Sequence, residues 1–216
     1  MKQKLFYVIL IMSLFILTAC SSDDNDNDNS SSINVKSNIE AIDLGLSVKW
    51  ASINLPGLYQ WGVVDNIAKD PYPYSGGSGY TFVDIGSDIS GTEYDAAHVI
   101  WGNGWRMPTA AEILELVRGC TSENAEQNGV KGKMFIGKNG NKIFLPYDGK
   151  IGGPRDYLGN KGYYWSSVPY EPTWGYAFFL KIDDGGVWAY CSYDKANPYD
   201  FPHKYYSFSI RPVRDK

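Results

Sequence analysis

Alternating apolar and polar positions mark both ends of the main region of the chain. Residues 44–50 are apolar at every even-numbered position, from Leu44 to Trp50, and this alternation predicts a half-buried strand. Residues 206–210 repeat the pattern near the C-terminus. Because Pro212 cannot donate to a ladder, this second strand is expected to end there or to lie at a sheet edge.

Further strands are expected in the second half of the chain, over residues 162–168, 176–183 and 187–193. Asp184-Gly185 separates the last two of these runs, which is a strong hairpin signal. Asn139-Gly140 predicts another hairpin within residues 133–146.

Two helices are expected before these strands, over residues 91–102 and 109–119. In the second helix, Thr109 and Glu112 have the spacing of a capping box, and Gly119 stands where a C-terminal left-handed residue is typical. Its expected apolar stripe consists of Ile113, Leu114 and Val117. The order of strand, two helices and a run of strands predicts an α+β fold with a mainly antiparallel twisted sheet and long ordered loops.

Composition supports this prediction and limits the chemistry. The 216 residues include 17 Tyr, 7 Trp and 23 Gly, which favours β-structure with long loops. The net charge of −4 leaves no basic footprint for nucleic acid, so no nucleic-acid partner is expected. With two His and three Cys, the chain offers little material for a metal site, and no cofactor is expected.

The first residues have the pattern of a secretory signal. Lys2 and Lys4 precede an apolar run over residues 5–17, which is too short to span a bilayer comfortably. A retained signal anchor is the alternative. The tetrapeptide "LTAC" at 17–20 resembles the bacterial lipoprotein box, which implies a signal peptide over 1–19 and lipidation of Cys20. The chain is then expected to reach the membrane through a lipid anchor.

Residues 20–39 are rich in Ser, Asn and Asp and are expected to form a solvated tether. Alternation of Asp24, Asp26 and Asp28 faintly resembles a calcium loop, but Asn29 and Val35 stand where that loop needs Gly and Glu. Acidic residues after a lipidated cysteine also resemble the surface-export signal of Bacteroidetes lipoproteins. This resemblance implies the outer face of the outer membrane, with a periplasmic orientation as the alternative.

Residues 40–216 resemble a known domain family. The segments that carry the resemblance are "AIDLGLSVKWAS", "YDAAHVIWGNGWRMPTAAEILELV", "NGNKIFLP", "GYYWSS" and "YYSFSIRPVR", in that order. They are similar to the Fibrobacter succinogenes major paralogous domain family, common in Bacteroidetes lipoproteins. The resemblance implies a C-type-lectin-like fold with adjacent N- and C-terminal strands and a binding surface on the loops between the late strands.

The segment "YDKANPYDFPHKYY", residues 193–206, falls at this expected surface and combines aromatic rings with Asn, Asp and Lys. Tyr and Trp give rigid contact area with a polar tip, which suits a glycan or a protein ligand. The candidate ligand-binding residues are Trp174, Trp188, Tyr190, Tyr193, Asn197, Tyr199, Phe201, His203 and Tyr205. The alternative is a packed loop whose aromatic rings cover the core of the domain.

Catalytic chemistry has weaker support. Cys120 and Cys191 could form a disulfide, remain two buried thiols, or act as the cysteine pair does in formylglycine-generating enzymes, which share the implied fold. His98 and His203 lack metal-ligand spacing, and Arg106 and Arg211 are expected to be structural.

The sequence "EPT" at 171–173 departs from the calcium motifs of sugar-binding C-type lectins. We therefore expect a surface binding module that is not an enzyme. The alternatives are a formylglycine-generating type of oxidoreductase, a structural component of the envelope or of fimbriae, and a receptor whose late loop is diversified by a retroelement.

Overall fold

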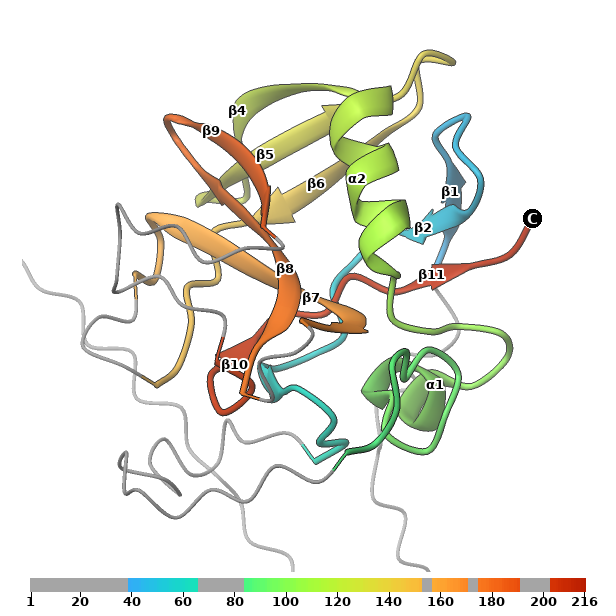
Figure 1. Cartoon of the computed structure of the whole chain (residues 1–216). Coiled ribbons are helices and arrows are strands. Elements are labelled where there is room, and N and C mark those ends of the chain that lie inside the picture. The colour runs from blue at the N-terminus through green and yellow to red at the C-terminus, as the bar shows by residue number, and fades with distance from the viewer. Residues whose placement is uncertain (1–38, 66–83, 153–156, 171–174, 191–202) are drawn as a thin grey trace, which may run out of the picture. The chain divides into compact units, whose positions relative to one another are not determined.

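The computed structural model describes residues 39–65, 84–152, 157–170, 175–190 and 203–216. All of them fall within the unit Val35–Lys216. The described residues form an α+β fold with two helices and four small antiparallel sheets (Figure 1). The α+β class and the antiparallel pairing agree with the sequence prediction, whereas the expected single sheet is divided into four. Across this part of the chain, no helix is long and apolar enough to cross a membrane.

The helices are α1 (Ala96–Trp101) and α2 (Ala110–Gly119). The strands are β1 (Ala41–Asp43), β2 (Lys49–Ala51), β3 (Tyr59–Gln60), β4 (Thr121–Gln127), β5 (Val130–Ile136), β6 (Lys142–Pro146), β7 (Lys161–Pro169), β8 (Ala177–Asp183), β9 (Gly186–Tyr190), β10 (Ser207–Phe208) and β11 (Val213–Arg214). Their sheet orders are β1-β2-β11, β10-β3, β4-β5-β6 and β7-β8-β9.

The two ends of the described region meet in one sheet. Strand β2 lies between β1 and β11, and Trp50 pairs with both Ile42 and Val213. The C-terminal strand therefore completes the sheet that the N-terminal strands begin, which confirms the expected proximity of the terminal strands (Figure 1).

The predicted strand over residues 44–50 is wrong in part, because only Lys49–Ala51 is a strand. Gly45 has a φ of +78°, and its N–H donates to the Asp43 carboxylate at 2.8 Å, so the chain turns here. The apolar side chains of the segment are nevertheless buried, with Leu44 and Trp50 each 1% exposed. The alternation identified core residues correctly, although it did not identify their backbone conformation.

The C-terminal alternation is also broken into pieces. Strand β10 covers only Ser207–Phe208 and pairs with β3, and the chain pairs again at Val213 beyond Pro212. The predicted strand therefore ends before Pro212, as expected, and the residues beyond Pro212 form a separate strand at the edge of the β1-β2-β11 sheet. Both faces of this segment are buried, because neighbours cover it from either side.

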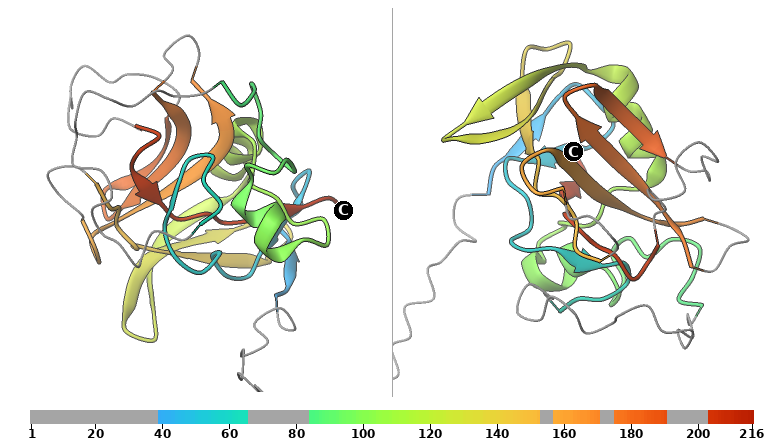
Figure 2. Two further views of the ribbon diagram at one scale, coloured as in Figure 1. Left: turned by 90° about the horizontal axis from the view of Figure 1, so that it is seen from below. Right: turned by 90° about the vertical axis from the view of Figure 1, so that its left-hand side faces the viewer.

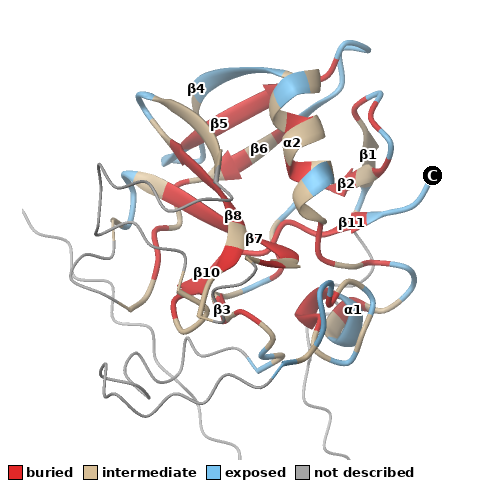
Figure 3. Cartoon of the chain, in the orientation of Figure 1, coloured by how far each residue is buried: buried red, intermediate tan, exposed pale blue. Residues whose placement is uncertain are grey.

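The hairpins predicted at Asp184-Gly185 and Asn139-Gly140 are present between β8 and β9 and between β5 and β6. A third hairpin, between β4 and β5, turns at Asn128-Gly129, and both of these residues have positive φ. The sequence reading missed β4, since its residues are polar on both faces. Figure 3 shows β4 exposed beside a buried β5, as expected for an edge strand.

Two apolar clusters cover opposite faces of the β7-β8-β9 sheet. Tyr163, Trp165 and Phe179 face the cluster that includes Tyr59, Trp101 and Phe208. Tyr164, Leu180 and Ile182 face the cluster that includes Trp50, Ile113 and Phe135. Because both faces are covered, β7 is buried along most of its length, Ser166 and Ser167 included. Figure 2 shows the strands of this sheet in two further views.

Helix α2 begins with the predicted capping box, in which Thr109 and Glu112 bond each other's backbone N–H groups. Its buried side chains are Ile113 and Leu116, while Leu114 and Val117 are half-buried, so the predicted stripe is displaced in part. Gly119 is not the expected left-handed residue, since it lies within the helix. A Cβ at this position would stand 2.6 Å from Leu46 Cδ2, so Gly119 serves close packing instead.

Candidate functional site

Most of the predicted ligand-binding residues lie outside the described residues. These are Trp174, Tyr193, Asn197, Tyr199 and Phe201, together with the lipidation candidate Cys20. Tyr190 is the last residue of β9, and only its backbone is described. Trp188, His203 and Tyr205 are described with their side chains.

Two of the predicted ligand-binding residues, His203 and Tyr205, lie together. Their ring centroids lie 4.6 Å apart in a stacked arrangement, and Tyr176 approaches His203 at 4.5 Å. Tyr206 packs edge-on against both rings. All of these rings are half-buried except that of Tyr206, which is buried.

Backbone pairing fixes this aromatic group. Tyr176 and His203 form a β-bridge, and the Lys204 N–H donates to the Gly175 carbonyl at 2.8 Å. The Gln60 side-chain amide donates to the Tyr205 carbonyl at 3.0 Å. The start of β8 and the end of β3 therefore hold residues 203–205 from two sides.

A buried lysine lies beneath these rings. Lys150 is 1% exposed, and its Nζ lies 4.5 Å from the Tyr206 ring centroid, 5.1 Å from that of Tyr163 and 5.7 Å from that of Tyr157. Distances within about 6 Å are typical of cation–π attraction. Residue Ile151, which follows the lysine, pairs with Ser207 through both backbone bonds, so Lys150 is inserted between β7 and β10.

Tyr157 extends the aromatic group in a strained conformation. Its φ is +55°, which is unusual for a bulky residue. The Lys161 Nζ lies 4.3 Å from the Tyr157 centroid, and the ring also leans on Tyr163 at 6.1 Å. Contacts of this kind hold such strain in place, and strained residues cluster at ligand sites.

A second lysine–aromatic pair lies on the other side of His203. The Lys204 Nζ lies 4.3 Å from the Trp61 centroid. The indole N–H of Trp61 donates to the Ser166 carbonyl at 2.9 Å, so the ring is fixed. We call the set formed by these groups the aromatic–lysine strip; ring and cation–π contacts link most of its members, and Lys204 joins it through its position between His203 and Tyr205 in the chain. The strip consists of Lys161, Tyr157, Lys150, Tyr206, Tyr176, His203, Tyr205, Lys204 and Trp61.

Burial lowers the pKa of two groups in the strip, His203 and Lys204. Burial, with a smaller contribution from the Lys150 charge, lowers the pKa of His203 to about 4, so the imidazole is neutral at pH 7. Burial also lowers the pKa of Lys204, and the charge of Asp84 opposes this shift. An anion placed near either group would offset these effects.

Trp188 lies apart from His203 and Tyr205. Lys181 pairs with Trp188 across β8 and β9, and its Nζ lies 5.2 Å from the Trp188 centroid. The indole covers the hairpin turn, because a Cβ at Gly186 would stand 3.1 Å from Trp188 Cζ2. Among the described rings, Trp188 contacts neither His203 nor Tyr205.

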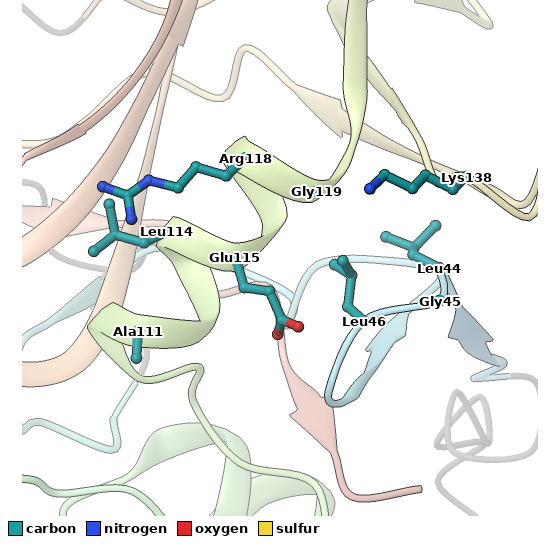
Figure 4. A pocket seen from close by; sticks show the side chains of 9 residues that line it. All are labelled: Leu44, Gly45, Leu46, Ala111, Leu114, Glu115, Arg118, Gly119 and Lys138. Atoms are coloured by element: carbon teal, nitrogen blue, oxygen red, sulfur yellow. The ribbon is translucent and has the colours of Figure 1, made fainter.

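A groove of about 540 Å³ runs between α2 and the turn after β1 (Figure 4). Its lining residues are Leu44, Gly45, Leu46, Ala111, Leu114, Glu115, Arg118, Gly119 and Lys138. The groove is preformed, because Asn139 and Asn141 both donate side-chain N–H groups to the Asp43 carbonyl at 2.8 Å.

The polar groups of the groove do not converge on one point. Glu115 accepts hydrogen bonds from both the N–H and the hydroxyl of Ser47, so its carboxylate is occupied. Figure 4 shows Lys138 directed toward Gly119, while Arg118 extends away from it. A ligand site normally needs a few converging polar groups on an apolar floor, so the aromatic–lysine strip is the better candidate.

Arg106 and Arg211, which lie in the sequence segments that resemble the domain family, are structural, as expected. Arg211 is 2% exposed, and its guanidinium donates to the carbonyls of Ala51 and Phe144 and to the Asn54 side chain. Burial lowers its pKa to about 10. Arg106 pairs with Glu112 at 2.6 Å and thereby joins the chain before α2 to its first turn.

Cys120 carries a free thiol that is half-buried at the end of α2. Cys191 lies outside the described residues. Burial and the charge of Glu115 raise the pKa of the Cys120 thiol, which disfavours the reactive thiolate. Within the described part of the chain, no three His, Cys, Asp or Glu side chains gather where they could hold a metal ion.

No protein-family model, curated protein or solved structure matches this chain. The site therefore has to be judged from its own geometry. Sequence reasoning missed Lys150, Tyr157, Lys161 and Lys204. A buried lysine has no distinguishing sequence pattern, and the only available signal was the repeated proximity of Lys to Tyr in residues 157–164 and 203–206.

Proposed function

We propose that this chain is a lipid-anchored binding module of the cell surface, which recognises a glycan or a protein ligand through its late loops. We further propose that it belongs to the Fibrobacter succinogenes major paralogous domain family and has a C-type-lectin-like fold. The lipoprotein box at Cys20 and the sequence segments of residues 40–216 support this assignment, and so does the pairing of the terminal strands.

One observation carries the proposed binding role, namely the ring cluster of Tyr176, His203 and Tyr205. These rings remain half-buried although they stack on one another. Rigid, partly exposed aromatic side chains supply ligand contact area with little loss of side-chain entropy. The Lys204 N–H, which donates to the Gly175 carbonyl, and the side-chain amide of Gln60, which donates to the Tyr205 carbonyl, hold the cluster, so a ligand would meet a preformed surface.

The binding role is tested with the full-length chain, purified in mild detergent and applied to a broad glycan array with calcium or with chelator. Tyr205→Ala and His203→Ala should remove a reproducible signal, because each deletes a ring of the cluster. His98→Ala is the matched control, since His98 is exposed on α1. Tyr199→Ala and Trp188→Ala test the rest of the predicted surface.

Thermal unfolding separates binding from packing. If Tyr205→Ala unfolds the domain, the aromatic residues form core and the proposal fails. If the variant melts as the wild type does but no longer binds, the cluster is a contact surface. Incorporation of a labelled fatty acid, expected for the wild type and absent from Cys20→Ser, tests the anchor independently.

A further inference from the structure

We propose that the ligand of the aromatic–lysine strip is an anionic saccharide, bearing carboxylate or sulfate groups, and that Lys161 and Lys204 bind those groups. This inference rests on the proposed binding function and specifies its ligand class. Three features of the strip support it.

The first feature is the use of the ring faces. Sugar-binding aromatic residues present an open face to the apolar side of a sugar ring. Here Lys161 lies 4.3 Å from the Tyr157 centroid and Lys204 lies 4.3 Å from the Trp61 centroid. Each of these rings therefore already has an ammonium group over one face. On that face a ligand would meet the positive charge of the lysine and not the surface of the ring.

The second feature is that aromatic rings, and not carboxylates of the described residues, position these ammonium groups. Among the described residues, neither Lys161 nor Lys204 forms an ion pair with a carboxylate. Asp84 influences the pKa of Lys204 but makes no salt bridge with it. An ammonium has three N–H donors, so one that rests on a ring still has donors for an anionic oxygen. The ring also restricts the flexible lysine stem, which lowers the entropy cost of binding.

The third feature is the buried charge between them. The Lys150 Nζ lies 5.7 Å from the Tyr157 centroid and 4.5 Å from the Tyr206 centroid, and the residue is 1% exposed, so it supports the rings and does not reach a ligand itself. Its charge also helps to keep His203 neutral. Positive charge at Lys161 and Lys204 favours a ligand with repeated negative groups over a neutral one.

Other cations of the molecule provide a contrast. Arg106 pairs with Glu112 and Asp215, and Lys216 pairs with Asp43. Lys138 and Arg118 form no salt bridge with any described residue, but neither lies over an aromatic ring within the described part of the chain. They are exposed at the groove beside α2 and serve as matched controls for charge removal.

The test measures binding of the full-length chain to polygalacturonate, chondroitin sulfate and neutral dextran at two salt concentrations. Binding to one or both polyanions is expected, weakening as salt rises. The double variant Lys161→Gln/Lys204→Gln should bind roughly tenfold more weakly or worse, since charge-assisted bonds are lost. Arg118→Gln/Lys138→Gln removes the same charge elsewhere and should bind as the wild type does.

A second readout uses the two histidines in NMR titrations. A bound polyanion beside the strip should raise the pKa of His203 from its low value, because the negative charge stabilises the imidazolium. Resonances of His98, which is exposed on α1, should not respond to the ligand.

The outcomes distinguish this inference from the proposed function. Equal binding of dextran and polyanions, lost in Tyr205→Ala but kept in the lysine double variant, overturns the anionic ligand and leaves the binding module intact. Equal weakening by both double variants also overturns it, because the effect would then be one of net charge. If no saccharide binds, the inference fails, and the binding role depends on a protein ligand that requires Tyr205.

Discussion

Two regions of this molecule hold positive charge in opposite ways. The buried Arg211 guanidinium donates hydrogen bonds to three oxygen atoms of the described residues: Asn54 Oδ1 at 2.7 Å, the Ala51 carbonyl at 2.9 Å and the Phe144 carbonyl at 2.6 Å. Along the aromatic–lysine strip, the ammonium groups of Lys161 and Lys204 instead lie over the rings of Tyr157 and Trp61.

The Arg211 network is closed. The side-chain amide of Asn54 donates to Asp148 Oδ2 at 2.7 Å, and the Ser209 hydroxyl donates to the same oxygen at 3.0 Å. Because the planar guanidinium matches fixed acceptors, it joins the chain after β2 to β6 and to the C-terminal segment. Each of its three nitrogen atoms donates to a protein oxygen, so we assign Arg211 a structural role.

The strip is open by comparison. A ring attracts a cation but does not consume its hydrogen-bond donors. The difference teaches that the groups around a cation indicate its role. A cation bonded to oxygen atoms inside the fold stabilises the fold. A cation that rests on a ring at a half-buried surface still has N–H donors for a ligand. The following predictions test this difference, starting with the largest expected effect.

Replacing Arg211 with Met should lower the free energy of unfolding by about 3 kcal/mol or more, because two buried carbonyls and Asn54 lose a charged donor. Denaturant unfolding measures this loss. Arg211→Lys, which keeps the charge without the planar fork, should recover only part of it. Full recovery would show that charge, and not geometry, is what the network requires.

Asp95→Asn should lower the free energy of unfolding by about 2 kcal/mol. The buried Asp95 carboxylate caps α1 and accepts four backbone N–H groups, those of Gly91, Ala97, His98 and Met107. An amide places N–H donors against two of these N–H groups, and they repel. Ligand binding by the folded variant should be unchanged, because Asp95 is no part of the strip.

The stability of the wild type should fall between about pH 6.5 and pH 4 through His203. Its pKa is about 4 in the folded chain and about 6.5 when unfolded, so the unfolded chain binds more protons in this range. His203→Phe keeps an aromatic ring and removes the titration. Melting temperatures across this range should therefore decline less steeply for His203→Phe than for the wild type, and parallel curves would contradict the prediction.

Lys161→Gln should change the free energy of unfolding by less than about 0.5 kcal/mol, because a half-buried charge without a carboxylate partner contributes little to stability. The same variant should weaken binding of a polyanion. A large loss of stability would place Lys161 with Arg211 among the structural cations, and the contrast between the two regions would disappear.

The sequence by itself determined the local features whose cause lies within a few residues. The capping box of Thr109 and Glu112 and the turns at Asp184-Gly185 and Asn139-Gly140 were predictable because short-range sterics and hydrogen bonds fix them. Alternation also identified buried residues such as Leu44 and Trp50.

Only the tertiary structure decided that Gly119 packs closely against Leu46, since this contact joins α2 to the turn that precedes β2. It likewise decided that Lys150 is buried and that Lys161 and Lys204 lie over rings. Lysine is ordinarily a surface residue, and its burial depends on which aromatic side chains the sheets bring to it from distant parts of the chain. His203 and Tyr205 could be proposed from the composition of residues 193–206 and from the family resemblance, but their contact with Tyr176 required the pairing of Tyr176 with His203.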